Sequence, residues 1–130
     1  MKISILTSAL ALFILVSSFE CQKQTTNTCY RGRLEVKGIC MNYTISVVSG
    51  KVDTSLVEQT WTDPQTGKTY HNAFGLGSPC SFPADIKEGD EFYFKVENTS
   101  DQNCIVCMAY YPTPSKHLSI KVMQGNCEAQ

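Results

Sequence analysis

Residues 29–49 read CYRGRLEVKGICMNYTISVVS, and this stretch decides the fold class. Apolar and polar side chains alternate over residues 30–36, and the alternation resumes over residues 39–47. A period of two places alternate side chains on opposite faces of a strand, whereas a helix needs spacings of three and four. Lys37-Gly38 separates the two runs. The stretch therefore predicts two half-buried strands joined by a tight turn.

Similar signals recur along the rest of the chain. Asp63-Pro64-Gln65-Thr66-Gly67 lies between two β-forming runs and predicts a hairpin, because proline and glycine supply the backbone angles of a turn. Further expected elements are a turn at 87–90, strands at 92–96 and 118–122, a buried strand at 104–111, an irregular loop from Phe74 to Pro83, and one helical turn opened by Asp53. About seven short strands predict an all-β domain, a small disulfide-stapled antiparallel β-sandwich, with a small β-barrel as the alternative.

The first twenty residues have the order of a secretory signal. Met1-Lys2 gives a short positive start, a mostly apolar run follows from Ile3 to Val16, and Ser17-Ser18 supplies small residues. A membrane-spanning helix needs about 20 apolar residues, and this run has about 14. We therefore expect export and removal of residues 1–20. About 110 residues would remain, enough for one domain.

Cys21 stands directly after this segment and before a polar stretch, residues 22–28. A cysteine in that position resembles the lipid-attachment site of bacterial lipoproteins, and the resemblance covers residues 1–28. It implies that Cys21 carries lipid and that residues 21–28 form a polar tether. Glu20 stands where that family has a small residue, so ordinary cleavage near Ser18 is the alternative. Secretion from a eukaryotic cell is another, in which Asn42 and Asn98 would be glycosylation acceptors.

Seven cysteines in 130 residues predict disulfides in an oxidising compartment. Setting Cys21 aside leaves six for three bridges: Cys29, Cys40, Cys80, Cys104, Cys107 and Cys127. Cys29 and Cys127 bound the expected domain, residues 29–127, and we expect them to pair because chain ends often lie close together. Cys104 and Cys107 would leave opposite faces of a strand, so each needs a separate partner. One of them should pair with Cys40 and the other with Cys80.

The cysteines also allow two other interpretations, a redox or zinc motif and a copper site. Cys104-Ile105-Val106-Cys107 has the spacing of a redox or zinc motif, but a β-forming run follows it rather than a helix, which favours structural bridges. Residues 89–98 resemble the strand that precedes the copper loop of cupredoxins. That resemblance implies a copper site made by His71, Cys107, His117 and Met123. The last three span 17 positions, whereas the family keeps them within one short loop.

Nothing in the sequence predicts catalysis. No serine has the context of a nucleophile elbow, and there is no glycine-rich phosphate loop. A net charge of −1 with interspersed signs gives no reason to expect a nucleic-acid partner, or membrane contact other than through the lipid. Outward-facing aromatics, Tyr93 and one of Tyr110 and Tyr111, are the one hint of a recognition surface, unless they pack under the loop from Phe74 to Pro83.

The sequence thus predicts a non-catalytic exported domain of the cell envelope, or a secreted one, with a structural or binding role. Its expected partner is an unidentified protein or another envelope component, and no metal or other cofactor is expected. An exported metal-binding protein of cupredoxin type, or a redox protein, is the alternative.

Overall fold

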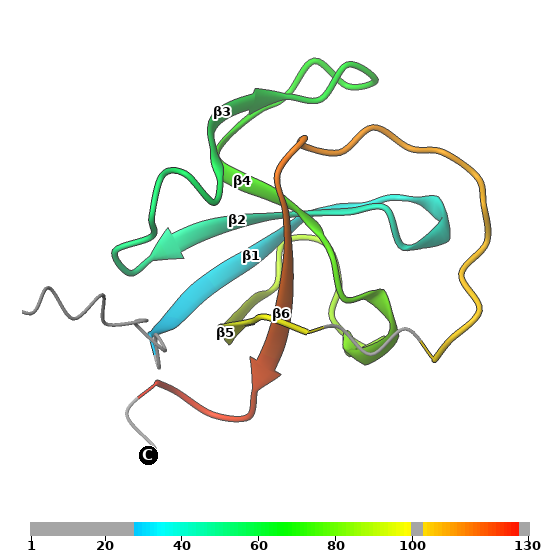
Figure 1. Cartoon of the computed structure of the whole chain (residues 1–130). Coiled ribbons are helices and arrows are strands. Elements are labelled where there is room, and N and C mark those ends of the chain that lie inside the picture. Colours follow the sequence, from blue (N-terminus) through cyan, green and yellow to red (C-terminus); the bar gives the residue numbers. More distant parts are fainter. Residues whose placement is uncertain (1–27, 100–102, 128–130) are drawn as a thin grey trace, which may run out of the picture.

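The computed structural model describes residues 28–99 and 103–127. The expected signal, Cys21 and all of the tether except Thr28 lie outside these residues. Among the residues described, no helix has the length and apolar character needed to cross a bilayer. The elements are β1 (Cys29–Lys37), η1 (Ile39–Met41), β2 (Tyr43–Ser49), β3 (Glu58–Thr62), β4 (Thr69–Leu76), η2 (Pro79–Ser81), β5 (Glu91–Glu97) and β6 (His117–Met123), as shown in Figure 1.

The six strands form one sheet that closes on itself. Its order is β2-β1-β5-β6-β4-β3, and a further pairing joins β2 to β4. Residues 44–46 of β2 lie opposite residues 73–75 of β4, which completes a ring through β1, β2, β4, β6 and β5. The all-β, disulfide-stapled domain is therefore confirmed, and of the two expected architectures the barrel describes these pairings. The sheet is mixed rather than wholly antiparallel, because β4 and β6 run parallel at Gly75 and His117.

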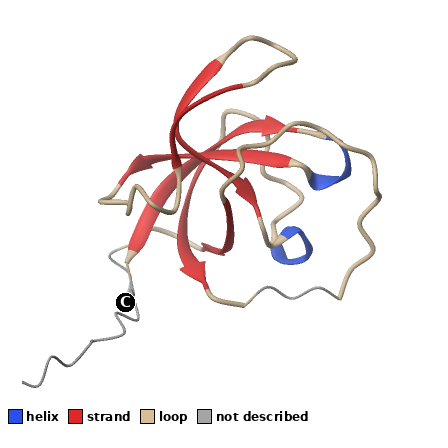
Figure 2. Ribbon diagram, turned by 45° about the horizontal axis from the view of Figure 1, so that its top comes forward, coloured by secondary structure: helices blue, strands red, loops and turns tan. Residues whose placement is uncertain are grey.

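Strand β3 lies outside this ring. It pairs only with the first half of β4, and Figure 2 shows that the resulting hairpin projects from the barrel. One fold serves many functions, so the connectivity assigns no ligand.

The core lies inside the barrel and is centred on Phe94, which is fully buried. The rings of Tyr30, Phe74 and Phe92 pack around it with centroids 5.5, 5.7 and 6.0 Å away. A Cβ at Gly32 would lie 2.9 Å from the Phe94 ring, so glycine on β1 makes room for it. The expected inward faces of residues 30–36 and 92–96 are thus correct.

The strand predicted over residues 39–47 begins later than expected. Residues 39–41 form η1, in which Cys40 and Met41 have left-handed backbones with φ of 53° and 59°. Strand β2 begins at Tyr43, and Ile39 is exposed rather than facing the core. Strict alternation also fails within β2, because Thr44 and Ser46 are buried on its other face. The disulfide and hydrogen bonds of η1, described below, account for the tight turn.

The prediction of an irregular loop from Phe74 is wrong for its first three residues. Phe74, Gly75 and Leu76 belong to β4 and are buried. The glycines that suggested a loop allow β6 to come close. A Cβ at Gly75 would lie 2.6 Å from the His117 ring, and one at Gly77 would lie 3.0 Å from the backbone of Leu118.

Beyond β4, Ser78 continues the seam with β6 through its side chain. Its buried hydroxyl donates to the carbonyl of Ile120 at 3.0 Å and accepts from the Ile120 amide at 2.8 Å. A serine side chain thus satisfies both backbone groups that a paired strand residue would satisfy.

The prediction of a buried strand over residues 104–111 is wrong. This segment has no regular secondary structure, and most of its side chains are exposed. Its cysteines nevertheless pair as expected. The bridges are Cys29–Cys127, Cys40–Cys107 and Cys80–Cys104, with Cα–Cα distances of 5.6, 5.0 and 5.4 Å.

These bridges should dominate the stability of the domain. They close segments with sequence separations of 98, 67 and 24, and each such bridge contributes roughly 2–4 kcal/mol by restricting the unfolded chain. We expect dithiothreitol to lower the melting temperature strongly, as followed by circular dichroism. A metal chelator should leave the melting curve unchanged. A curve that shifts with the chelator, or one that ignores the reductant, would contradict this prediction.

Candidate functional site

Four large apolar side chains stand exposed in the described part of the chain. Ile105 and Met108 are almost completely exposed (103% and 97%), and Tyr110 and Ile39 follow at 80% and 58%. They come from two segments joined by the Cys40–Cys107 bridge. We call these four residues the apolar loop surface. Grouped apolar side chains in water mark interaction sites more often than scattered ones do.

Three of the four lie on the long connection between β5 and β6. Figure 1 shows residues 103–116 of this connection as an arc that leaves the barrel before entering β6. Cys104 attaches the arc to Cys80 in η2, and Cys107 attaches it to Cys40 in η1. Two bonds three residues apart therefore fix a segment that has no secondary structure of its own.

Asn42 adds a polar tie between η1 and the arc. Its side-chain amide donates to the carbonyl of Ile39 at 2.7 Å and to the carbonyl of Ala109 at 2.9 Å. Both amide hydrogens are thus used inside the protein, one to close the turn and one to hold the arc. This engagement disfavours Asn42 as a glycan acceptor, whose amide nitrogen must be accessible.

Tyr111 anchors the next part of the arc. Its hydroxyl donates to Oδ2 of Asp63 at 3.3 Å, and a Cβ at Gly38 would lie 2.9 Å from its ring. Asp63 is fully buried and also accepts hydrogen bonds from the Gln65 amide and the Thr66 hydroxyl. Of the adjacent tyrosines, Tyr111 thus packs against the protein and Tyr110 points into solvent.

The end of the arc is fixed to β3. Glu58 accepts hydrogen bonds from the backbone amide and the hydroxyl of Ser115, the latter at 2.7 Å. The Ser115 hydroxyl is the main cause that lowers the pKa of Glu58. Pro114 beside it is fully buried. The arc is therefore held at Cys104, Cys107, Ala109, Tyr111 and Ser115, while Ile105, Met108 and Tyr110 between these points remain uncovered.

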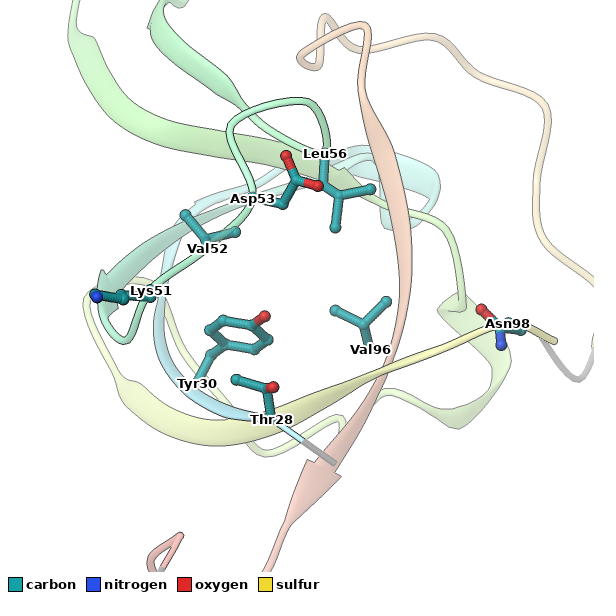
Figure 3. Close-up of a pocket in the computed structure, with 8 residues that line it drawn as sticks. All are labelled: Thr28, Tyr30, Lys51, Val52, Asp53, Leu56, Val96 and Asn98. Atoms are coloured by element: carbon teal, nitrogen blue, oxygen red, sulfur yellow. The ribbon is translucent and has the colours of Figure 1, made fainter. Parts of the chain in front are cut away.

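A hollow lies on another part of the barrel, and Figure 3 shows the side chains that line it. It encloses about 610 Å³. Tyr30, Leu56 and Val96 face one another across it, and the Lys51 ammonium and Asn98 amide lie at its outer edge. Asp53 on its rim accepts a hydrogen bond from the Ser55 amide at 2.8 Å, which lowers the pKa of its carboxyl and closes a turn. The Asp53 carboxylate therefore stabilises this local turn.

The proposed copper ligands do not form a site. Cys107 is bonded to Cys40 and has no thiolate to offer, and the same bridges divide the pair Cys104 and Cys107. His117 and Met123 occupy opposite ends of β6, roughly 20 Å apart at 3.3 Å per residue. Within residues 28–99 and 103–127, no group of three or more His, Cys, Asp or Glu side chains is arranged to hold a metal ion.

The sequence indicated only part of the apolar loop surface. The pattern offers Tyr110 as a candidate, whereas it places Ile39, Ile105 and Met108 in strands. Tyr93, the other candidate, lies half-buried on β5 opposite Arg31 and Met123 and belongs to no such surface. The sequence signal for this loop is the pair Cys104 and Cys107. These two cysteines bond to separate, distant partners, and the segment that carries them pairs with no strand.

Comparison with known proteins gives no further assignment. No family model matches the chain, and neither a curated protein nor a solved structure is significantly similar to it.

The tie between Glu58 and Ser115 should be sensitive to pH. A lowered folded pKa means that the tie stabilises the fold above the usual carboxyl value near 4.5, and that this contribution is lost as the pH falls through the lowered pKa. We expect Ser115→Ala to raise the pKa of Glu58 in a carboxyl ¹³C NMR titration. Glu91, whose pKa is lowered chiefly by Arg33, should not change and serves as the control. An unaltered Glu58 titration would refute the assignment.

Proposed function

We propose that this chain is a non-catalytic, exported binding domain of the cell envelope whose apolar loop surface contacts a partner protein. The carrying observation is that the exposed large apolar side chains of the described chain gather around one disulfide, Cys40–Cys107. A loop whose backbone is fixed by two disulfides loses little backbone freedom on binding, which favours affinity.

The residue types support binding to a protein. Tyrosine and methionine are enriched at the cores of protein interfaces, and methionine adapts to partners of different shape. Nine consecutive residues, Asn103 to Tyr111, carry no charged side chain. An anionic lipid surface would instead attract lysine and arginine. A protein partner with an apolar contact surface therefore fits this arc better than a membrane does.

The carboxyl groups with lowered pKa values have local structural roles. Active sites bring groups with shifted pKa values together in one cleft. Here the carboxyl groups with lowered pKa values are separate, and each bonds to a neighbour: Asp53 to Ser55, Glu58 to Ser115, and Glu91 to Arg33 at 2.7 Å. Asp53 holds a turn, Glu58 holds the end of the arc, and Glu91 links strands β5 and β1.

The disulfides indicate where the domain works. Three bridges form and persist in an oxidising compartment outside the cytoplasm. The tether enters at Cys29, and the arc is attached beyond the other end of the nine-residue β1 (Figure 1). A lipid on Cys21 would then leave the apolar loop surface directed away from the bilayer, available to a partner.

Photocrosslinking tests the proposed surface. A benzophenone amino acid replaces Ile105 in the full-length protein, in the cells that produce it, and Gln65 at the exposed tip of the hairpin is the matched control site. We expect a discrete protein adduct from position 105 and none from position 65. Met108→Glu should reduce the adduct about tenfold, since losing a central interface contact costs about 1–2 kcal/mol. Equal labelling at both sites, or none at 105, would contradict the proposal.

The anchor is tested separately by intact mass. We expect the mature chain to begin at Cys21, to carry several acyl chains and to sediment with membranes, because one chain of about 0.8 kcal/mol per methylene binds only marginally. Cys21→Ser should release the protein into the soluble fraction. A soluble wild-type chain that begins at Phe19 or Glu20 would rule the anchor out.

A further inference from the structure

Residues 105–114 of the arc form an extended segment. No helix, strand, turn or bend occurs within them, and Figure 1 shows this part of the chain as an open curve beside the barrel. Met108 and Tyr110 are exposed, whereas Tyr111 packs against the protein at Gly38. An extended backbone presents alternate side chains to opposite sides, so Met108 and Tyr110 point the same way, into solvent.

The short turn η1 holds the segment on both sides of Met108. Before Met108, Cys107 is bonded to Cys40 within η1. After Met108, the carbonyl of Ala109 accepts a hydrogen bond of 2.9 Å from the side chain of Asn42, which directly follows η1. Between these two attachments the Met108 side chain is 97% exposed. The fold therefore fixes the backbone around an apolar side chain that it leaves in solvent.

The segment is also restricted beyond Met108. Tyr111 is tied to Asp63 by a hydrogen bond of 3.3 Å. Pro112 and Pro114 each fix one backbone angle, and Pro114 is fully buried. A segment held at several points has little backbone freedom left to lose when it binds. It is therefore preorganised for a partner that binds an extended polypeptide.

The shape and chemistry of the segment fit the active-site cleft of a protease. Such a cleft binds an extended chain and takes one side chain into a primary pocket, which in chymotrypsin is an apolar slot. Met108 suits an apolar pocket, and the run from Asn103 to Tyr111 contains no charged side chain that would lose its water there. Complexes between proteases and proteins that inhibit them are among the tightest known for their area.

The double attachment determines what cleavage after Met108 would do. Hydrolysis would add one water molecule across the Met108–Ala109 bond, leaving a carboxyl group on Met108 and an amino group on Ala109. In a free peptide these new ends separate and leave the protease. Here the disulfide holds one end at η1 and Asn42 holds the other, so their effective concentration stays high and the bond can re-form. The loop would then remain in the cleft and block it.

We propose that the arc is a protease-binding loop, in which Met108 enters the apolar primary pocket of a protease and the extended chain on either side lies along the cleft. This inference rests on the proposed binding function and names the class of partner. Ile105 and Tyr110 then contact the cleft before and after the pocket. The consequence is inhibition of the protease, because the held loop occupies the place of a substrate.

Inhibition of chymotrypsin tests this inference. The exported protein is purified from the producing cells with its disulfides intact, and trypsin, whose primary pocket carries an aspartate, is the comparison enzyme. We expect competitive inhibition of chymotrypsin that persists for hours, and inhibition of trypsin that is roughly a hundredfold weaker. A linear peptide of residues 103–113 with Cys104→Ser and Cys107→Ser should be cleaved as an ordinary substrate. Absence of chymotrypsin inhibition, or rapid cleavage of the loop without inhibition, would overturn the proposal.

A single substitution should transfer the inhibition from one enzyme to the other. Met108→Arg supplies the cation that the trypsin pocket binds, and Gln65→Arg places the same cation at the exposed tip of the hairpin. We expect Met108→Arg to inhibit trypsin and to inhibit chymotrypsin roughly a hundredfold less than the wild type does, while Gln65→Arg behaves as the wild type. Both variants should keep the wild-type melting temperature, because both positions are exposed. A folded Met108→Arg with both inhibition constants unchanged would overturn the assignment of Met108.

The two proposals fail separately. No inhibition of chymotrypsin together with a crosslink from position 105 would remove the protease and leave the binding function. Inhibition without any crosslink would remove a partner in the producing cells and leave the arc as an inhibitor of proteases that reach those cells from outside.

Discussion

Cys40 has a left-handed backbone conformation, which residues other than glycine rarely adopt, and its disulfide bond to Cys107 stabilises that conformation. Left-handed backbone at Cys40 and Met41 costs about 1–2 kcal/mol for each residue. The disulfide and the two hydrogen bonds donated by Asn42 stabilise this turn. In return the turn ends β1, allows β2 to begin at Tyr43, and carries the arc away from the barrel. The start of β2 and the apolar loop surface both depend on this one link.

Small side chains make the rest of the arrangement possible. Gly75 and Gly77 let β6 approach β4, Ser78 extends that contact through its hydroxyl, and Gly38 gives Tyr111 a place to pack. Larger side chains at these points would separate β6 or the arc from the barrel. The ring of strands and the attached arc therefore depend on small residues at close contacts as much as on apolar side chains. The hydrophobic pattern of the sequence shows the apolar side chains but not these close contacts.

The difference between apolar contacts and close contacts at small residues explains which strands could be predicted from the sequence. Alternation located β1, β5 and β6 correctly, because each has one face on the Phe94 core and one face toward water. The same reasoning treated Gly75 as a loop residue, because glycine needed for close packing looks like glycine needed for a turn. The same alternation predicts Ile105 to be buried, because an exposed isoleucine and a buried one are identical in a sequence pattern. The positions of the cysteines were more informative, since a covalent bond constrains distant segments regardless of which face a side chain occupies.

The positions of Cys29 and Cys40 also have a mechanical consequence. If a partner pulled on the arc while an anchored amino terminus held the other end, tension would act between Cys107 and Cys29. That tension passes through the Cys40–Cys107 sulfur bond and then along β1, which is already extended. The path is covalent throughout, and its β1 section is already extended, so pulling would lengthen that section only slightly. Force on the complex would thus bypass the hydrogen-bonded seams of the barrel, and the domain could transmit tension without unfolding.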